Sequence, residues 1–137
     1  MKIQIIKFRE NVKLPKRAHY NDAGADVYAI ENYDILPHQT IKVPLGFGMK
    51  LPDGFMCNVY PRSGLTSKGI ISHIPPIDSG YTGEIHCIIT NTTDEVYMIN
   101  KDDKIAQLVV VPIILSEFTE TLGEERGDNG FGSTDNK

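Results

Sequence analysis

The sequence of 137 residues has few cysteines, no long apolar run and no excess of basic side chains. Its two cysteines, Cys57 and Cys87, form no CxxC pair, which argues against a zinc ribbon and against a disulfide-stabilised secreted scaffold. We therefore expect two buried, reduced thiols. The longest apolar run, 108–115, contains a proline and is far shorter than the ~20 residues that a membrane-spanning helix needs. Charges interrupt the N-terminal segment, so it lacks the apolar region of a signal peptide. Together these absences predict a cytoplasmic protein with no membrane segment.

The charge balance is slightly acidic: 14 Lys and Arg side chains oppose 18 Asp and Glu side chains, giving a formal net charge of −4. Surfaces that coat nucleic-acid phosphates carry an excess of positive charge, so nucleic acid is not expected as a partner. A smaller polyanion would have to be held by local groups. With 40% apolar and 23% charged residues, the chain has the composition of an ordinary globular protein, and its length fits one domain.

Apolar residues recur with period two or in brief β-branched runs, a pattern typical of short strands. The strongest candidates lie at 3–8, 40–43, 55–60, 85–91, 96–99 and 105–114. Residues that favour turns separate them at 51–54, 91–94 and 100–103, and the segment 63–69 alone suggests a short helix. This spacing predicts an all-β fold of the sandwich or jelly-roll type.

The composition changes near residue 122, where the chain becomes rich in glycine and charge. Such a stretch cannot bury a core of its own, so we expect residues 1–121 to form the domain and residues 122–137 to form a mobile arm. The arm contains Arg126, Phe131, two hydroxyl residues and several glycines. These groups suit a segment that grips phosphate and stacks on a base, and a frayed terminus is the alternative.

Three internal segments carry chemistry. Arg62, Ser63 and Gly64 follow the predicted strand 55–60, where a guanidinium, a hydroxyl and an accessible backbone N–H suit phosphate oxygens. In the segment 77–84, Asp78 precedes a turn and could act as a general base, with Tyr81 able to pack on a sugar ring. The alternatives without a functional role are a turn with an exposed arginine at position 62 and an Asx-type turn with a half-buried tyrosine at position 81.

The third segment holds two carboxylates, Asp22 and Asp26, at the junction of a loop and a strand. They could attract Mg²⁺, a hard cation that prefers oxygen ligands and often engages substrate phosphates, or they could be turn caps. The four histidines show no spacing typical of metal ligands and are interpreted as surface or packing residues.

Five motifs now follow one another along the chain: DAGAD at 22–26, PRSG at 61–64, IDSGYTGEI at 77–85, KDDKIAQL at 101–108 and RGDNGFGST at 126–134. Their order closely resembles that of the five motifs of the trimeric dUTPase family, the deoxyuridine 5′-triphosphate nucleotidohydrolases. The resemblance covers residues 22–134, nearly the whole chain.

The resemblance implies a jelly-roll homotrimer, a distorted double-sheet barrel, with active sites at the subunit interfaces. Its expected activity is that of a dUTP diphosphatase: Mg²⁺-dependent hydrolysis of dUTP to dUMP and pyrophosphate, which lowers dUTP and supplies dUMP for thymidylate synthesis. Asp78 would activate the water that attacks the α-phosphorus. Asp26 would organise waters around a Mg²⁺ ion held mainly by the triphosphate.

The resemblance also implies how the substrate is bound. Tyr81 would stack on deoxyribose and disfavour a ribose 2′-hydroxyl, while Pro76, Ile77 and the strand around His86 would lie against uracil. Phosphate contacts are implied for Arg62, Ser63, Gly64 and Gln107. The arm would close over the nucleotide, with Phe131 on uracil and the other residues on the β and γ phosphates, namely Arg126, Gly132, Ser133 and Thr134.

The chain departs from the family pattern before Asp78, where the loop is about two residues shorter than usual and lacks the usual Asn and Gly. Pro75 and Pro76 have no backbone N–H to offer to a base. Ser72 or His73 is a candidate replacement for the Asn contact. In the fourth motif, the usual Gly-Asp-Arg is Asp-Asp-Lys at 102–104, which keeps a carboxylate and a cation.

Two other functions compete with this interpretation. The dCTP deaminases share the fold, but they use a glutamate at the position that aligns with Ile88, so deamination would lack its proton shuttle here. A non-catalytic regulatory module on the same fold is the second alternative. The presence of every chemically active position argues against it.

Overall fold

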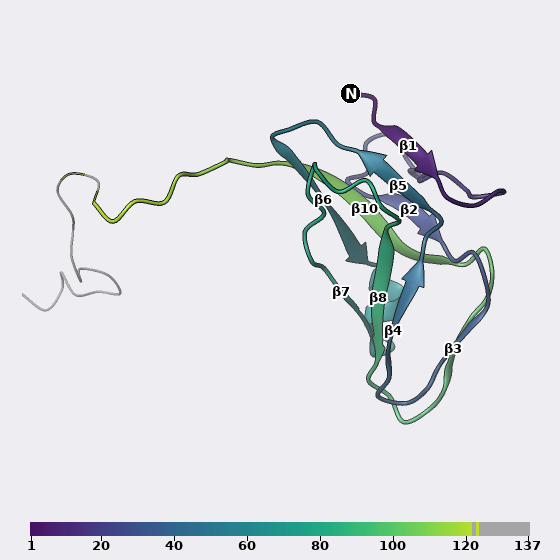
Figure 1. Ribbon diagram of the computed structural model, residues 1–137. Helices are drawn as coiled ribbons and strands as arrows, with labels where there is room; N and C mark the ends of the chain where they lie inside the picture. The colour runs from purple at the N-terminus through teal and green to yellow at the C-terminus, as the bar shows by residue number, and fades with distance from the viewer. Residues whose placement is uncertain (122, 124–137) are drawn as a thin grey trace, which may run out of the picture.

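The computed structural model describes residues 1–121 and residue 123 of the protein (Figure 1). In this part of the chain, all strands pair in antiparallel fashion and form four small sheets. Two of them pair β1 (Gln4–Lys7) with β5 (Phe47–Lys50) and β3 (Tyr33–Ile35) with β9 (Tyr97–Ile99). The other two have three strands each, in the orders β2 (Ala25–Tyr28), β10 (Lys104–Pro112), β6 (Phe55–Pro61) and β4 (Thr40–Pro44), β8 (His86–Asn91), β7 (Ile70–His73). The predicted all-β fold is confirmed.

Alternation along the strands separates the core from the surface. In β8, the residues Cys87, Ile89 and Asn91 are buried, whereas His86 is exposed and Ile88 and Thr90 are partly buried on the opposite face. The same core receives Phe47 and Ile35 from two other sheets and Leu45 from the link between β4 and β5. Cys57 and Cys87 are free and buried, as predicted, and burial raises the pKa of each thiol to about 11.

The helix α1 (Ser63–Thr66) is shorter than the predicted segment 63–69. The chain after it continues in turns, and Gly69, at a φ of +83°, leads into β7. None of the described helices is long and apolar enough to cross a membrane.

Four strands, β2, β3, β5 and β7, were not among the strand candidates, although a strand was expected to follow the loop that holds Asp22 and Asp26. Each has only three or four residues, too few for a period of two to be recognised. The turn at 100–103 is present, with the Asp103 N–H donating to the Asn100 carbonyl at 3.0 Å. It does not close a hairpin, because β9 pairs with β3 while β10 pairs with β2 and β6.

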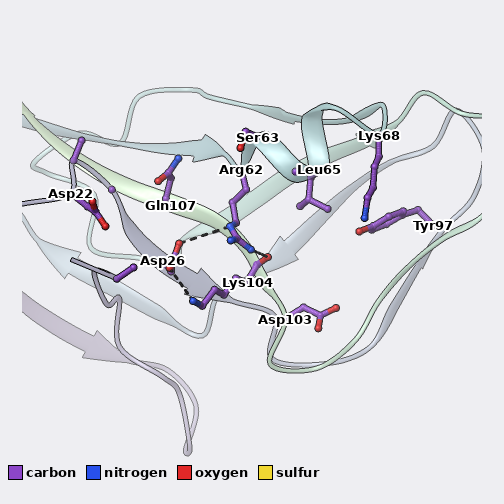
Figure 2. A pocket seen from close by; sticks show the side chains of 14 residues that line it. Asp22, Asp26, Arg62, Ser63, Leu65, Lys68, Tyr97, Asp103, Lys104 and Gln107 are labelled. Carbon is purple, nitrogen blue, oxygen red and sulfur yellow. Dashed lines mark hydrogen bonds and ion pairs between the residues drawn. The ribbon is translucent and has the colours of Figure 1, made fainter. Parts of the chain in front are cut away.

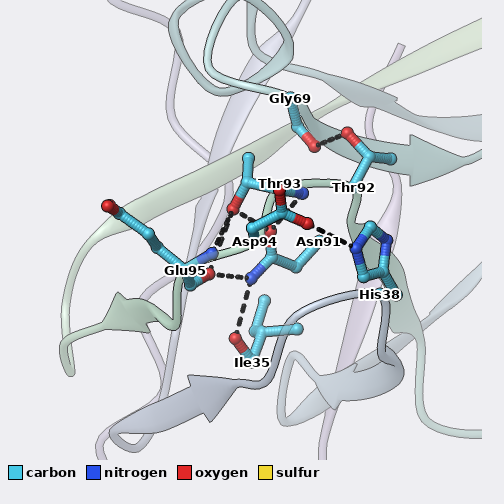
Figure 3. A network of polar contacts seen from close by, with 8 residues as sticks. All are labelled: Ile35, His38, Gly69, Asn91, Thr92, Thr93, Asp94 and Glu95. Carbon is cyan, nitrogen blue, oxygen red and sulfur yellow. Dashed lines mark hydrogen bonds and ion pairs between the residues drawn. The ribbon is translucent and has the colours of Figure 1, made fainter.

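Asn91 organises the loop that follows β8 (Figure 3). Its side-chain amide is fully buried and donates to the carbonyls of Ile35 at 2.9 Å and Glu95 at 2.7 Å, while its oxygen accepts from the N–H and hydroxyl of Thr93. A buried amide with all these partners stabilises one loop conformation. This network lies at the end of β8 remote from His86, the end where a pocket described below is found.

After β10, residues 113–121 run away from the body of strands (Figure 1). The Ile113 N–H still donates to the Gly54 carbonyl at 2.9 Å, and beyond it Ile114, Leu115 and Phe118 are exposed. The predicted arm, 122–137, lies outside the described residues apart from Gly123.

Candidate active site

The first of two relevant pockets, here called the Arg62 pocket, has a volume of about 630 Å³ and lies beside β2, β10 and the start of α1 (Figure 2). Five residues predicted from the sequence line it: Asp26, Arg62, Ser63, Gly64 and Gln107. Strand pairing brings them together, because Gln107 on β10 lies opposite Asp26 on β2 and opposite Tyr60 on β6, two residues before Arg62.

A bulge in β10 shapes this pocket. Lys104 pairs with Tyr28 and Ala106 pairs with Val27, so β10 contains one residue more than β2 across this stretch. In a regular strand, residues three apart point to opposite faces. The bulge instead allows both Lys104 and Gln107 to line the same pocket.

Two cations converge on the Asp26 carboxylate, whose side chain is only 14% exposed (Figure 2). The Lys104 ammonium lies 3.4 Å from Oδ2, and the Arg62 Nε lies 3.9 Å from Oδ1. Arg62 also donates from NH1 to the Lys104 carbonyl at 3.1 Å, which fixes the guanidinium against β10. Lys68 adds a further cation to the lining of the pocket.

The other two carboxylates of the Arg62 pocket are engaged in turns. Asp22 accepts the His19 N–H at 2.9 Å, and Asp103 accepts the Asn100 N–H at 2.8 Å. The lining thus balances three carboxylates with three cationic side chains, and of the carboxylates only Asp26 is paired with them within the described residues, which leaves Lys68 and the remaining Arg62 donors for an anionic ligand.

Neutral donors complete the pocket. The first N–H groups of a helix have no intrahelical acceptor, which leaves those of Ser63 and Gly64 available to a ligand. The Gln107 amide donates to the Pro61 carbonyl at 3.2 Å and lies directly over Gly24. A Cβ on Gly24 would come within 2.2 Å of the Gln107 Oε1, so the glycine is needed for this position of the glutamine.

The second pocket, the Asp78 pocket, has a volume of about 280 Å³ and is formed by the loop between β7 and β8 together with parts of β4, β6 and β8. The predicted residues that line it are Pro76, Ile77, Asp78, Tyr81 and His86. His73, a candidate replacement for the Asn contact, lines it as well, as do Lys42 and Ile88, which were not expected to line a site.

Backbone contacts hold this loop on the body of the protein. The N–H and carbonyl of Ile77 both bond to Cys57 of β6, at 2.8 and 3.1 Å. Further along, Gly83 packs on Gly48 of β5 so closely that a Cβ on Gly48 would lie 2.4 Å from the Gly83 oxygen. The glycine inside β5 therefore lets the loop dock.

Within the loop, Asp78 and Tyr81 belong to one turn, in which the Tyr81 N–H donates to the Asp78 carbonyl at 3.1 Å. Asp78 is exposed, and its carboxylate has no hydrogen bond or ion pair within the described residues. The Tyr81 hydroxyl donates to the Glu84 carbonyl at 2.7 Å and its ring covers Gly83, so the aromatic face is held in place. A free carboxylate beside a fixed aromatic ring suits a base acting next to a sugar.

Not every predicted residue reaches a pocket. Ser72 is buried on the core face of β7, where its Oγ lies 3.9 Å from the Cys87 Sγ, so its side chain is not available to a ligand, contrary to the prediction. Because strand residues alternate, its neighbour His73 points to the pocket face instead. The arm residues assigned from the sequence, Arg126, Phe131, Gly132, Ser133 and Thr134, lie outside the described residues.

Among the residues that the structure describes, none lines both the Arg62 pocket and the Asp78 pocket. Lys68, Lys104 and Gly24 in the first pocket and Lys42 in the second escaped the sequence analysis as site residues. For Lys104 a signal was present, since it is the cation of the fourth motif. Nothing in the local sequence indicates that Lys42, a surface position of β4, borders a pocket.

Comparison with known proteins gives a consistent result along the chain. The dUTPase family model matches residues 10–135. The deoxyuridine 5′-triphosphate nucleotidohydrolase of Picosynechococcus sp. is 35% identical over an alignment covering 98% of this chain and 99% of that protein. The one from Corynebacterium glutamicum is 39% identical, with coverage of 96% and 93%.

Solved structures show the same relationship. A Staphylococcus bacteriophage 80alpha dUTPase mutant with dUpNHpp superposes with a TM-score of 0.84 at 27% identity, covering 97% of this chain and 98% of that chain. A mutant dUTPase from phage phi11 of S. aureus also has a TM-score of 0.84, at 26% identity and with coverage of 92% of this chain and 99% of that chain. That structure reveals the coordination of a structural Mg(II) ion in the phage protein. The chain belongs to the dUTPase family.

Proposed function

We propose that the protein hydrolyses dUTP to dUMP and pyrophosphate. One observation carries this proposal: in a chain that the dUTPase family model matches over residues 10–135, the residues expected to bind phosphate share one pocket, and Asp78 and Tyr81 share another. The slightly acidic net charge does not oppose it, because a compact triphosphate needs only local cations, which the Arg62 pocket supplies.

Asp78 is the general base of the proposed reaction. Its carboxylate accepts a proton from a water molecule, whose oxygen forms a bond to the α-phosphorus. The bond from the α-phosphorus to the bridging oxygen breaks, and pyrophosphate leaves with the electron pair. The exposed, unpaired carboxylate of Asp78 supports this role, since a paired one would have to be freed first.

The other residues bind and orient the substrate. Arg62, Gln107 and the N–H groups of Ser63 and Gly64 hold phosphate oxygens, and charge-assisted bonds of this kind are the strong ones. Tyr81, fixed through Glu84, covers the deoxyribose and leaves no room for a 2′-hydroxyl. Pro76, Ile77 and His86 lie against the base.

Magnesium fits the Arg62 pocket only as a substrate-borne ion. Within the described residues, no group of three His, Cys, Asp or Glu side chains comes together, and the Asp26 carboxylate is already close to two cations. Asp26 would therefore hold the ion through water while the triphosphate supplies the other oxygens. When bound, Mg²⁺ would neutralise phosphate charge and favour attack at phosphorus.

We propose that the active protein is a homotrimer. The separation of the phosphate set from Asp78 supports a site built from the Arg62 pocket of one copy and the Asp78 pocket of another. The arm, with Arg126, Phe131, Gly132, Ser133 and Thr134, is proposed to close over this shared site. The two free thiols fit a reducing compartment such as the cytoplasm.

The direct test is to incubate the purified protein and Mg²⁺ with dUTP, dCTP, dTTP and UTP and to identify the products. Formation of dUMP and pyrophosphate from dUTP, with little reaction of UTP, is expected. Ammonia release from dCTP would favour a deaminase instead, and tight nucleotide binding without any product would favour a regulatory module. Light scattering should give three times the 15.3 kDa chain mass, and truncation after Thr121 should leave the trimer but remove most activity.

A further inference from the structure

The loop that borders the Asp78 pocket has few backbone groups to offer to a base. Pro75 and Pro76 have no N–H, and the N–H and carbonyl of Ile77 are both used by Cys57. A uracil ring presents two acceptors, O2 and O4, on either side of the N3–H donor. Side chains that border the pocket can therefore add to the contacts that the backbone of the loop and of β8 makes with the ring.

His73 is placed to supply such a group. It lies opposite Ile88 at the end of β7, and Lys42 lies opposite the same residue from β4, so all three share the outer face of this sheet. All three also line the Asp78 pocket, together with Asp78 and Tyr81. His73 therefore faces the pocket that contains the proposed base and the proposed sugar platform.

The His73 ring is oriented by two threonines on the neighbouring strands. Its Nε2 lies 2.8 Å from the Thr90 Oγ1, which in turn lies 2.7 Å from the Thr40 Oγ1. The Nδ1 atom has no partner within the described residues. One ring nitrogen is thus anchored in the sheet, while the other is left for a ligand.

Resting on the proposed dUTP hydrolysis, we propose that the His73 Nδ1 binds the Watson–Crick edge of uracil and selects it against cytosine. The hydrogen bond between the His73 Nε2 and the Thr90 hydroxyl can run in either direction, depending on the tautomer of the ring. If Nε2–H donates to Thr90, Nδ1 is an acceptor for the uracil N3–H, and it opposes the N3 lone pair of cytosine. If Thr90 donates to Nε2, Nδ1–H donates to the uracil O4, and it opposes the cytosine amino group. When cytosine occupies the same position as uracil, both directions of this hydrogen bond favour uracil.

The other polar side chains of the pocket are less suited to this task. The His86 Nδ1 lies 3.1 Å from the carbonyl of Glu84, just before its own strand, and the described residues give the ring no anchor on a second strand. Lys42 can only donate, and it does so from a long, flexible stem. His73 is the pocket side chain that is held across three strands, through Thr90 and Thr40.

Covalent structure provides a matched pair of variants. An asparagine side chain carries its amide as many bonds from the backbone as the histidine Nδ1, whereas a glutamine side chain reaches as far as Nε2. His73→Asn therefore keeps a polar group for the base and gives up the Thr90 contact. His73→Gln keeps the Thr90 contact and gives up the group at Nδ1. His38→Gln serves as control, because His38 contacts Asp94 and lines neither pocket.

The experiment measures kcat/KM for dUTP and dCTP hydrolysis, and the dissociation constants of dUMP and dCMP, for the wild type and the three variants, each checked for thermal stability and oligomeric state. His73→Gln should lower the preference for uracil by about tenfold, the loss expected for one hydrogen bond left unmade in a recognition site. His73→Asn should keep it within about threefold, and His38→Gln should not change it.

An unchanged preference in His73→Gln would overturn the proposal. So would an equal loss in both His73 variants, because that result would assign to His73 only the structural contact with Thr90. If the wild type did not hydrolyse dUTP at all, the proposed function would fail, and the dUMP to dCMP binding ratio would still decide for or against His73.

Discussion

The Arg62 pocket and the Asp78 pocket are built by different means. In the Arg62 pocket, the functional side chains come from strands in fixed register: Asp26 opposite Gln107, and Arg62 directly after the strand on the other side of β10. Sheet hydrogen bonds thus set the spacing of its cations and amide. A rigid array of this kind suits a ligand group that is the same in every nucleotide, the triphosphate.

The Asp78 pocket depends instead on a loop without regular structure between β7 and β8. The loop is held by the Ile77–Cys57 bridge and by the close approach of Gly83 to Gly48. Loops tolerate changes of length more readily than strands do. The difference indicates that the proposed phosphate contacts are set by the sheet, whereas the proposed base contacts depend on a loop whose length can change, such as the shortened segment with its two prolines in this chain.

Asp78→Asn should have the largest effect on activity. It removes the proposed base while keeping the size of the side chain, so turnover of dUTP should fall by about 10² to 10⁴-fold. Binding of a non-hydrolysable dUTP analogue, measured by calorimetry, should change little. Normal turnover in this variant would remove Asp78 from the mechanism.

Gly48→Ala tests the backbone contact that docks the Asp78 loop. The added methyl group would lie 2.4 Å from the Gly83 oxygen, so the loop must shift. Because a displacement of about 1 Å can cost about 100-fold in rate, kcat/KM should fall by that order. Unfolding by urea should show a loss of about 1–3 kcal/mol from the overpacking. Retention of both activity and stability would contradict the docking role of Gly48.

Gly24→Ala makes the corresponding change in the Arg62 pocket, where the added methyl group meets a side chain instead of the backbone. Gln107 must move away, and kcat/KM should fall by about tenfold, the value of one lost hydrogen bond. Gln107→Gly removes every Gln107 side-chain atom that the methyl group would meet, its Cβ included, so the double variant should be no worse than Gln107→Gly alone. Additive losses in the double variant would show that Gly24 acts by another route.

The buried thiols line neither pocket, so they are expected to affect reactivity and stability and to have the smallest effect on turnover. Because burial raises the pKa of Cys57 and Cys87 to about 11, the native thiols carry about 100-fold less thiolate than exposed ones at pH 8. Alkylation by iodoacetamide should be slower by at least that factor than in urea, as mass spectrometry would show. Equal rates would contradict the tight seating of Cys57 beneath the Asp78 loop.

The same thiols give stability a pH dependence of defined sign. Their preference for the protonated form in the folded state stabilises the protein below the ordinary thiol pKa of about 9, and this contribution is lost as the pH rises towards 11. The free energy of unfolding should therefore decline over this range, and less steeply in a Cys57→Ala, Cys87→Ala double variant. A decline of equal slope in both proteins would exclude the thiols as its cause.

Much of the fold and both pockets could be predicted from the sequence. Long strands such as β8 and β10 can be recognised from their alternating β-branched residues. The residue types around Arg62 indicate phosphate binding, and those around Asp78 indicate a general base. What the sequence could not reveal depends on contacts between distant segments. The bulge before Gln107 can be recognised only from the pairing of β10 with β2. The need for a glycine at position 48 can be recognised only from its contact with Gly83.

The error at Ser72 has a similar origin. Whether Ser72 or His73 faces the pocket depends on the face that each residue occupies in β7, and this four-residue strand was not predicted. Once the strand is known, alternation decides between the two residues, because Ser72 follows the buried Ile70 by two positions. The position of this short strand therefore decides which of the two side chains, Ser72 or His73, faces the pocket, and composition alone could not decide it.

The account's central claim is that one active site combines the Arg62 pocket of one copy with the Asp78 pocket of another. Arg62→Ala and Asp78→Asn variants with different affinity tags, each inactive alone, can be co-expressed and purified through both tags. In such mixed trimers one site in three would pair an intact Arg62 pocket with an intact Asp78, so dUTP hydrolysis at about one third of the wild-type rate is predicted. Mixed trimers as inactive as the parent variants would show that each chain carries a complete site, and would contradict the claim.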